Sequence, residues 1–261
     1  MAPSLTELTF ALGVGDRVVG VTAQCDFPPD VRTLPKVGTF LSPNVERVLA
    51  LRPDIVLATP SPANRRAVEQ LRNLGVRVFV VDPQSVTDLA ESMRVVGAEL
   101  GVAERGRELS EQFRASIEEV RQRVAQSRPR KVLFVVGRNP LIAVGRGTIQ
   151  DELVRLAAGV NIVAAHGWPK VSVEFVLREA PEVILDATMG SEALAESAGA
   201  DFWQRFTSLP AVQNHRVISF MDDRVLRPGP RLPEGLRALA WAIHPEAFSD
   251  EHEPAGQGHT R

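Results

Sequence analysis

Cysteine, tyrosine and lysine are scarce or absent in this chain of 261 residues. There is one cysteine, Cys25, and no tyrosine, and only three of the 30 basic residues are lysines. A single cysteine excludes an internal disulfide and a cysteine-based metal cluster. The net charge is −2, with 30 basic and 32 acidic residues, so the composition gives no indication of a nucleic-acid-binding surface.

Long apolar runs and common enzyme signatures are also missing from the sequence. No apolar run reaches the ~18 residues that a membrane-spanning helix needs, and there is no GxSxG, HExxH or GK[ST] phosphate loop. The Gly145–Gly147 stretch is typical of a turn before a helix rather than of a dinucleotide loop. None of the five histidines has a second histidine four residues away, so we expect no metal site; His166, in the loop HGWPKV, is the one candidate ligand.

Short β-branched runs alternate with amphipathic stretches, which is the pattern of an α/β fold. We predict strands at 17–22, 54–58, 76–82, 131–136, 182–187 and 216–220. We predict helices at 4–12, 44–51, 62–74, 86–100, 148–157, 172–179 and 232–243. Ser4 and Glu7 have the spacing of a capping box at the first of these helices.

One predicted helix is much longer than the others. Residues 103–127 contain no proline, and their apolar residues recur at helical spacing: Leu109, Phe113, Ile117, Val120 and Val124. A helix of this length is about 37 Å long. That is long for a connection inside one compact α/β unit, so the helix either covers one sheet or joins two sheets as a rigid strut.

An internal repeat favours the second of these arrangements. Residues 44–58 (NVERVLALRPDIVLA) align without gaps with residues 172–186 (SVEFVLREAPEVILD). The two copies lie on opposite sides of the long helix. We therefore predict two similar α/β lobes, 1–102 and 128–248, joined by the helix 103–127, and a disordered polar tail at 249–261.

Two sets of residues stand out as candidate functional groups. Phe27, Phe40 and Trp168 lie in proline- and glycine-containing loops, where an aromatic ring either covers a neighbouring core or forms a flat wall for a large ligand. Glu46 and Glu174 occupy matched positions of the repeat. They either offset helix dipoles or dock a two-fold symmetric partner through its basic residues.

Four stretches give the chain a resemblance to a known family. They are PSLTELTFALGVGDRVVGVTAQCDFPP, LPKVGTFLSPNVERVLALRPDIVLA, WPKVSVEFVLREAPEVIL and LRPGPRLPEGLRALAWAIHP. The chain resembles the cobalamin-binding proteins of ABC importers, which belong to the class III periplasmic binding proteins of the TroA-like superfamily. The resemblance implies two Rossmann-like α/β lobes joined by one long helix, no enzymatic activity and no cofactor. It also implies a monomer that captures a corrinoid between its lobes.

The resemblance assigns roles to particular residues. Phe40 and Trp168 fall where the family has ligand-stacking tryptophans, and Gln24, beside Phe27, falls where it has a tyrosine. Asp223 and Arg227 fall on polar ligand contacts. Glu46 and Glu174 fall on the carboxylates that meet arginines of a dimeric membrane permease.

The same resemblance leaves the ligand open between a corrinoid and a ferric siderophore or haem. Gln24 and Phe40 reduce the aromatic wall, and Arg146, Arg224 and Arg227 are suited to an anionic ligand. An α/β enzyme with two Rossmann-like halves is the third alternative. The family usually has a further strand before the A-P-S motif, so we expect that the coding start lies upstream. An export signal for the periplasm would then precede Met1.

Overall fold

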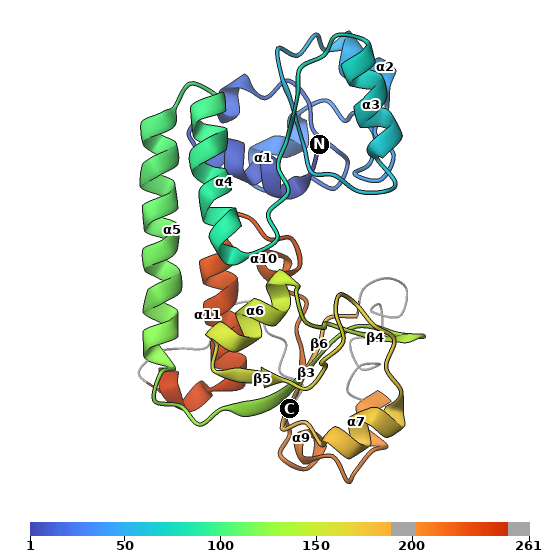
Figure 1. Cartoon of the computed structure of the whole chain (residues 1–261), viewed down its shortest axis with the longest axis vertical. Helices are drawn as coiled ribbons and strands as arrows, with labels where there is room; N and C mark the ends of the chain where they lie inside the picture. The colour runs from blue at the N-terminus through green and yellow to red at the C-terminus, as the bar shows by residue number, and fades with distance from the viewer. Residues whose placement is uncertain (189–201, 250–261) are drawn as a thin grey trace. The chain divides into compact units, whose positions relative to one another are not determined.

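The computed structural model describes residues 1–188 and 202–249, and the chain forms two compact units (Figure 1). The first unit comprises Met1–Arg114 and Arg227–Pro230. The second comprises Ala115–Leu226 and the residues from Arg231 onward. The predicted disordered tail, 249–261, lies outside the described residues except for its first residue.

The first unit is mainly helical around a small parallel sheet. Its strands, β1 (Val56–Ala58) and β2 (Val78–Val80), pair in the register Val56↔Val78. Its helices, in chain order, are α1 (Pro3–Ala11), η1 (Gly15–Arg17), η2 (Pro29–Thr33), α2 (Val45–Ala50), α3 (Arg65–Asn73), α4 (Val86–Glu99) and the first half of α5 (Ala103–Arg123).

The predicted strand at 17–22 is not formed. Arg17 ends η1, and Val21 makes only an isolated bridge to Lys36. Val18, Val19 and Gly20 instead line a cavity whose other side includes Val56 and Leu57 of the β1 region. The stretch 35–37 binds the backbone of Val21 alone, with Val21 N–H donating to Pro35 O and Val37 N–H donating to Val21 O, both at 3.0 Å. A β-strand needs a series of such bonds along its length.

The predicted capping box is also absent. Helix α1 begins at Pro3, after Ala2, so Ser4 lies inside the first turn instead of preceding it. Proline suits the first helical position because its missing N–H would have no partner there. Glu7 is buried, with 6% of its surface exposed.

The second unit contains a five-stranded sheet. Its strands are β3 (Arg130–Arg138), β4 (Leu141–Ala143), β5 (Gly159–Asn161), β6 (Val183–Asp186) and β7 (Val217–Ser219). The order is β4-β3-β6-β7, and β5 also pairs with β3; only the β3–β4 pair is antiparallel. The helices are the second half of α5, α6 (Ile149–Leu156), α7 (Val173–Glu179), α9 (Pro210–Gln213), α10 (Asp223–Leu226), α11 (Leu232–Ile243) and η4 (Pro245–Phe248).

Strand β6 carries the core of this unit. All four of its residues are buried, as a strand with parallel neighbours on both sides requires. The carboxylate of Asp186, at its carboxyl end, accepts hydrogen bonds from Arg138 Nε (3.0 Å), Trp203 Nε1 (2.9 Å) and the hydroxyl of Thr188 (2.7 Å). A buried carboxylate needs such partners, since an unpaired charge costs several kcal/mol.

The long predicted helix is present as α5, which ends at Arg123 instead of residue 127. Its predicted apolar stripe is largely buried: Phe113, Ile117, Val120 and Val124 are each at most 8% exposed. In the first unit α5 lies beside α4 (Figure 1), and two glycines face each other there. A Cβ added to Gly97 would lie 2.7 Å from Cα of Gly106. None of the described helices is long and apolar enough to cross a membrane.

This contact yields a stability prediction. Gly106→Ala should lower the free energy of unfolding by about 1–3 kcal/mol, because the new Cβ would lie 2.8 Å from the carbonyl oxygen of Met93 and force the helices apart. Alanine is a better helix former than glycine by ~1 kcal/mol, so helix propensity alone predicts that the substitution raises the free energy of unfolding. Urea unfolding measures the difference, with Glu108→Ala, at an exposed position of the same helix, as the control. A stabilised Gly106→Ala variant would contradict the close packing.

Candidate functional site

The first unit contains four of the predicted ligand-binding residues. Oε1 of Gln24 accepts a hydrogen bond from the backbone N–H of Phe40 at 3.0 Å. Nη1 of Arg227 lies 3.5 Å from the carbonyl oxygen of Gln24. Phe27, in the same loop as Gln24, has 40% of its surface exposed, and Phe40 is half-buried. Two aromatic rings and one guanidinium therefore come from neighbouring loops.

Sequence reasoning missed one member of this group. Nη1 of Arg227 lies 3.4 Å from both carboxylate oxygens of Asp26, a residue between two predicted site positions. The side chains are 34% and 52% exposed, respectively, so the pair contributes only ~0–1 kcal/mol to stability. Asp26 offsets the positive charge that Arg227 would offer to an anionic ligand. The two residues are 201 positions apart in the sequence, so no local pattern could have indicated this pair.

The second unit supplies Trp168 and Asp223. Trp168 is 61% exposed, although its loop is firmly held: Gly145 N–H donates to Gly167 O at 2.8 Å, and Gly167 N–H donates to Arg146 O at 2.9 Å. The Gly145–Gly147 stretch thus forms a turn before α6, as predicted. A ring this exposed is not a cover over a core. Asp223 begins α10 and is exposed.

The two matched glutamates occupy equivalent structural positions. Glu46 and Glu174 are the second residues of α2 and α7, and both are exposed. The preceding residues cap the helices: Asn44 Oδ1 accepts from Arg47 N–H at 2.7 Å, and Ser172 Oγ accepts from Phe175 N–H at 3.2 Å. The structure thus reproduces the repeat found in the sequence.

The environment of Glu174 favours its charged form. Its own backbone N–H and the hydroxyl of Ser172 hydrogen-bond the carboxylate and lower its pKa below the usual value. The carboxylate remains exposed to solvent. Glu174 therefore places a negative charge in the first turn of α7, where it is open to solvent.

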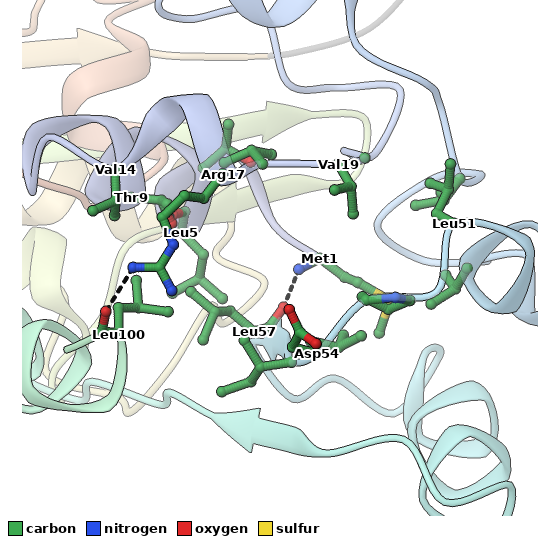
Figure 2. Close-up of a pocket in the computed structure, with 18 of the residues that line it drawn as sticks. Met1, Leu5, Thr9, Val14, Arg17, Val19, Leu51, Asp54, Leu57 and Leu100 are labelled. Atoms are coloured by element: carbon green, nitrogen blue, oxygen red, sulfur yellow. Dashed lines mark hydrogen bonds between the residues drawn. The ribbon is translucent and has the colours of Figure 1, made fainter.

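The first unit also holds a cavity of about 310 Å³, which Figure 2 shows in close-up. Its lining is mostly apolar, including Leu5, Val19 and Leu57. Arg17 at its edge donates to the carbonyl oxygen of Leu100 at 2.8 Å. None of the predicted ligand-binding residues lines it, and neither does any aromatic side chain. Its volume is at the lower end for small-molecule sites, so this cavity does not suit a corrinoid or a haem.

No group of three or more histidine, cysteine and acidic side chains that could hold a metal ion occurs within residues 1–188 and 202–249. His166, the one candidate ligand in the sequence, is exposed and forms a backbone bridge with Arg146. The only cysteine, Cys25, is buried, with its sulfur 3.2 Å from the hydroxyls of Thr6 and Thr22.

The two-unit α/β architecture, the long helix and the exposed aromatic loops are those of a binding protein. A model of the periplasmic binding protein family matches residues 1–223, and the chain belongs to this family. It is a substrate-binding protein of the ABC-importer type and not an enzyme.

Two curated relatives are similar in sequence to most of this chain. The chain is 32% identical over 258 residues to an uncharacterized ABC transporter substrate-binding lipoprotein, YvrC, of Bacillus subtilis; the match covers 96% of this chain and 80% of the relative. It is 33% identical over 234 residues to the vitamin B12-binding protein of Yersinia pestis, with 89% and 80% covered.

Solved structures confirm the predicted fold class. The vitamin B12-binding protein BtuF of Vibrio cholerae superposes with a TM-score of 0.80 at 28% identity, covering 95% of this chain and 96% of that one. The haem-binding protein RhuT from Roseiflexus sp. RS-1 superposes with a TM-score of 0.83 at 29% identity, covering 94% and 97%. Among these neighbours, similar folds therefore occur in proteins named for binding vitamin B12 and for binding haem.

The capping geometry of α7 gives a titration prediction. Ser172→Ala should raise the pKa of Glu174 toward its usual value, because the variant removes a hydroxyl that hydrogen-bonds the carboxylate. NMR titration of the glutamate side chains measures the shift. Ser172→Thr keeps the hydroxyl and should leave the pKa low. An unchanged pKa in Ser172→Ala would show that the backbone N–H alone lowers it.

Proposed function

We propose that this chain captures a corrinoid of the cobalamin type and delivers it to a dimeric ABC permease. The observation that carries the proposal is the exposure of aromatic rings on well-held loops, above all Trp168 at 61%. A corrinoid presents a broad, flat face that such rings cover well. The proposed contacts are Phe27, Phe40 and Arg227 in the first unit, where Gln24 holds the backbone of Phe40, and Trp168 with Asp223 in the second. The relatives named for vitamin B12 support the same choice.

Haem is the second candidate, because some structural neighbours bind it. Protein-bound haem iron is usually coordinated by histidine, cysteine, methionine or tyrosine. Tyrosine is absent from this sequence, and Cys25 is buried between two hydroxyls. His166, His215 and Met221 are the exposed candidates that remain in the described chain. Cobalamin carries its own axial base and needs no protein ligand, so the composition of this chain favours the corrinoid.

The basic side chains are less suited to binding a ferric siderophore. Arg224 donates to both carboxylate oxygens of Asp222 at 2.6–3.2 Å, and Nη1 lies 3.5 Å from Glu234. Arg227 lies beside Asp26. Two of the three arginines that suggested an anionic ligand thus already have carboxylate neighbours, and an anionic chelate would have to compete with them.

The docking part of the proposal rests on Glu46 and Glu174. A homodimeric permease presents each basic patch twice, and one exposed carboxylate at the start of α2 and one at the start of α7 could meet both copies. We place the chain outside the cytoplasmic membrane, as a monomeric partner of that permease. This placement follows the relatives, which include a substrate-binding lipoprotein.

Ligand titration tests the first part. The parent protein should bind cyanocobalamin more tightly than haemin in calorimetry. Trp168→Ala should weaken corrinoid binding by ~1–3 kcal/mol, the scale of base–aromatic stacking. Phe40→Ala should cost less because a smaller ring is lost, and Phe40→Trp should keep or strengthen binding. Leu74→Ala, at an exposed apolar residue at the end of α3, is the control. Tighter binding of haemin, or unchanged affinity in both alanine variants, would overturn the assignment.

Transport tests the second part. Glu46→Ala and Glu174→Ala should each impair uptake into permease-containing vesicles, and the double variant should be worst, since removing one partner of a desolvated pair costs ~2–5 kcal/mol. Ligand affinity and melting temperature should stay near the parent values because both carboxylates are exposed. Glu108→Ala on α5 controls for loss of an exposed carboxylate. Normal uptake by the double variant would leave helix capping as the sole role of these residues.

A further inference from the structure

The loop that carries Phe40 is closed by its own hydrogen bonds. Thr39 N–H donates to Ser42 O at 3.1 Å, and Ser42 N–H donates to the Thr39 hydroxyl at 3.0 Å. Gly38 begins the turn with φ +96°, and a Cβ there would lie 2.6 Å from Ser42 O. Only glycine fits this backbone position without strain. The turn at 38–43 therefore has one well-defined backbone path.

Two side chains from other loops hold the backbone of Phe40. Gln24 Oε1 accepts from its N–H at 3.0 Å, and Nδ2 of Asn64 lies 3.4 Å from its carbonyl oxygen. The backbone N–H and the backbone C=O of Phe40 are thus both hydrogen-bonded by side chains, which are 16 and 24 positions away in the sequence. The ring of Phe40 consequently projects from a backbone fixed on both sides.

Asn64 is built into the protein interior. It is fully buried, and its Oδ1 accepts from Ser61 N–H at 3.0 Å while its Nδ2 donates to Thr59 O at 3.0 Å. These bonds fix the orientation of the amide, because only the oxygen accepts and only the nitrogen donates. Asn64 therefore anchors the Phe40 loop to the segment that follows strand β1.

Gln24 differs from Asn64 because its side chain is exposed, so two roles are open to it. Its oxygen is occupied by Phe40 N–H, and its Nε2 donates to no other residue within the described chain. Gln24 could act through Phe40, or it could donate directly to an acceptor on the ligand. The hydrogen bond already formed without ligand favours the first role.

We infer that Gln24 and Asn64 are positioning residues that hold the Phe40 ring in its ligand-binding orientation before the ligand arrives. The inference rests on the proposed function, in which Phe40 is a ligand contact. Pre-ordering a side chain removes part of the entropic cost of binding. Loss of either hydrogen bond therefore weakens the ligand complex without removing a ligand contact.

The test compares two variants at position 24. Gln24→Ala removes the acceptor for Phe40 N–H, whereas Gln24→Glu keeps an acceptor and loses the amide donor. Hydrogen exchange of the peptide covering 38–43, without ligand, should rise in Gln24→Ala and stay near the parent level in Gln24→Glu. Calorimetry with cyanocobalamin should show about three- to tenfold weaker binding for Gln24→Ala and nearly parental binding for Gln24→Glu. In a Phe40→Ala background, Gln24→Ala should have no further effect.

Asn64 needs a second measurement because its side chain is buried. Asn64→Ala should raise exchange at 38–43 and weaken binding about as much as Gln24→Ala, again only when Phe40 is present. Ser61→Ala is the matched control, since it removes the 3.2 Å bond from Asn64 N–H to the Ser61 hydroxyl and keeps both bonds to Phe40. If Asn64→Ala unfolds, exchange in the Gln24 pair alone decides the inference.

These experiments distinguish failure of the positioning role from failure of the proposed function. A parent protein that binds no cyanocobalamin overturns the corrinoid assignment, while the exchange experiment still tests whether the loop is held. Parental exchange in Gln24→Ala overturns the positioning role. Equal weakening by Gln24→Ala and Gln24→Glu, with normal exchange in the latter, would make Gln24 a direct donor to the ligand and also overturn it.

Discussion

In each unit a short helix must turn directly into a parallel strand, and the rest of the site depends on that turn. Helix α2 leads into β1 through Arg52, and α7 leads into β6 through Ala180; both residues have left-handed backbones, with φ 45° and 51°. A proline follows each of them and prevents the helix from continuing. Glu46 and Glu174 each precede this left-handed residue by six positions and lie in the first turns of the two helices.

The two copies of this unit diverge at the carboxyl end of the strand. In the repeat, Ala58 of β1 corresponds to Asp186 of β6. Asp186 binds Arg138 and Trp203 and closes that end with a buried polar network. Ala58 makes no such network, and the chain after it instead supplies Asn64, whose amide reaches Phe40. Ligands of parallel α/β folds commonly bind at this end of the strands. The same framework thus carries a buried polar network in one copy and, in the other, an amide that reaches the proposed ligand contact Phe40.

Local pattern was enough to predict most of the fold. The apolar stripe of α5, the proline boundaries and the buried strands β3 and β6 all depend on residues close in sequence. The segment 17–22 has the composition of a strand, but it pairs with another stretch only at Val21, and no local signal in the sequence indicates this. Strands β4 and β5 have three residues each and are too short to show a period. The predicted start of α1 was wrong because Pro3 begins the helix before Ser4 can cap it.

The candidate site was predictable only in part. Loop position identified Phe27, Phe40 and Trp168, because an aromatic ring in a proline- and glycine-containing turn has little core to enter. The hydrogen bonds that hold Phe40 come from side chains 16 and 24 residues away, and the Arg227–Asp26 pair spans 201 residues. Such contacts depend on tertiary packing. The spacing of residues in a single sequence does not indicate them. The family resemblance supplied Gln24 and Arg227, and the structure supplied Asn64 and Asp26.

The contact between Gly97 and Gly106 has a mechanical consequence for the first unit. Most helix pairs are separated by a layer of side chains, and small shifts are absorbed there by changes of rotamer. Here the backbones of α4 and α5 meet with no such layer between them. A displacement of the first turns of α5 must therefore carry α4 along rather than slide past it. A spectroscopic label on the exposed side of α4 would consequently report the movement of both helices as one rigid element.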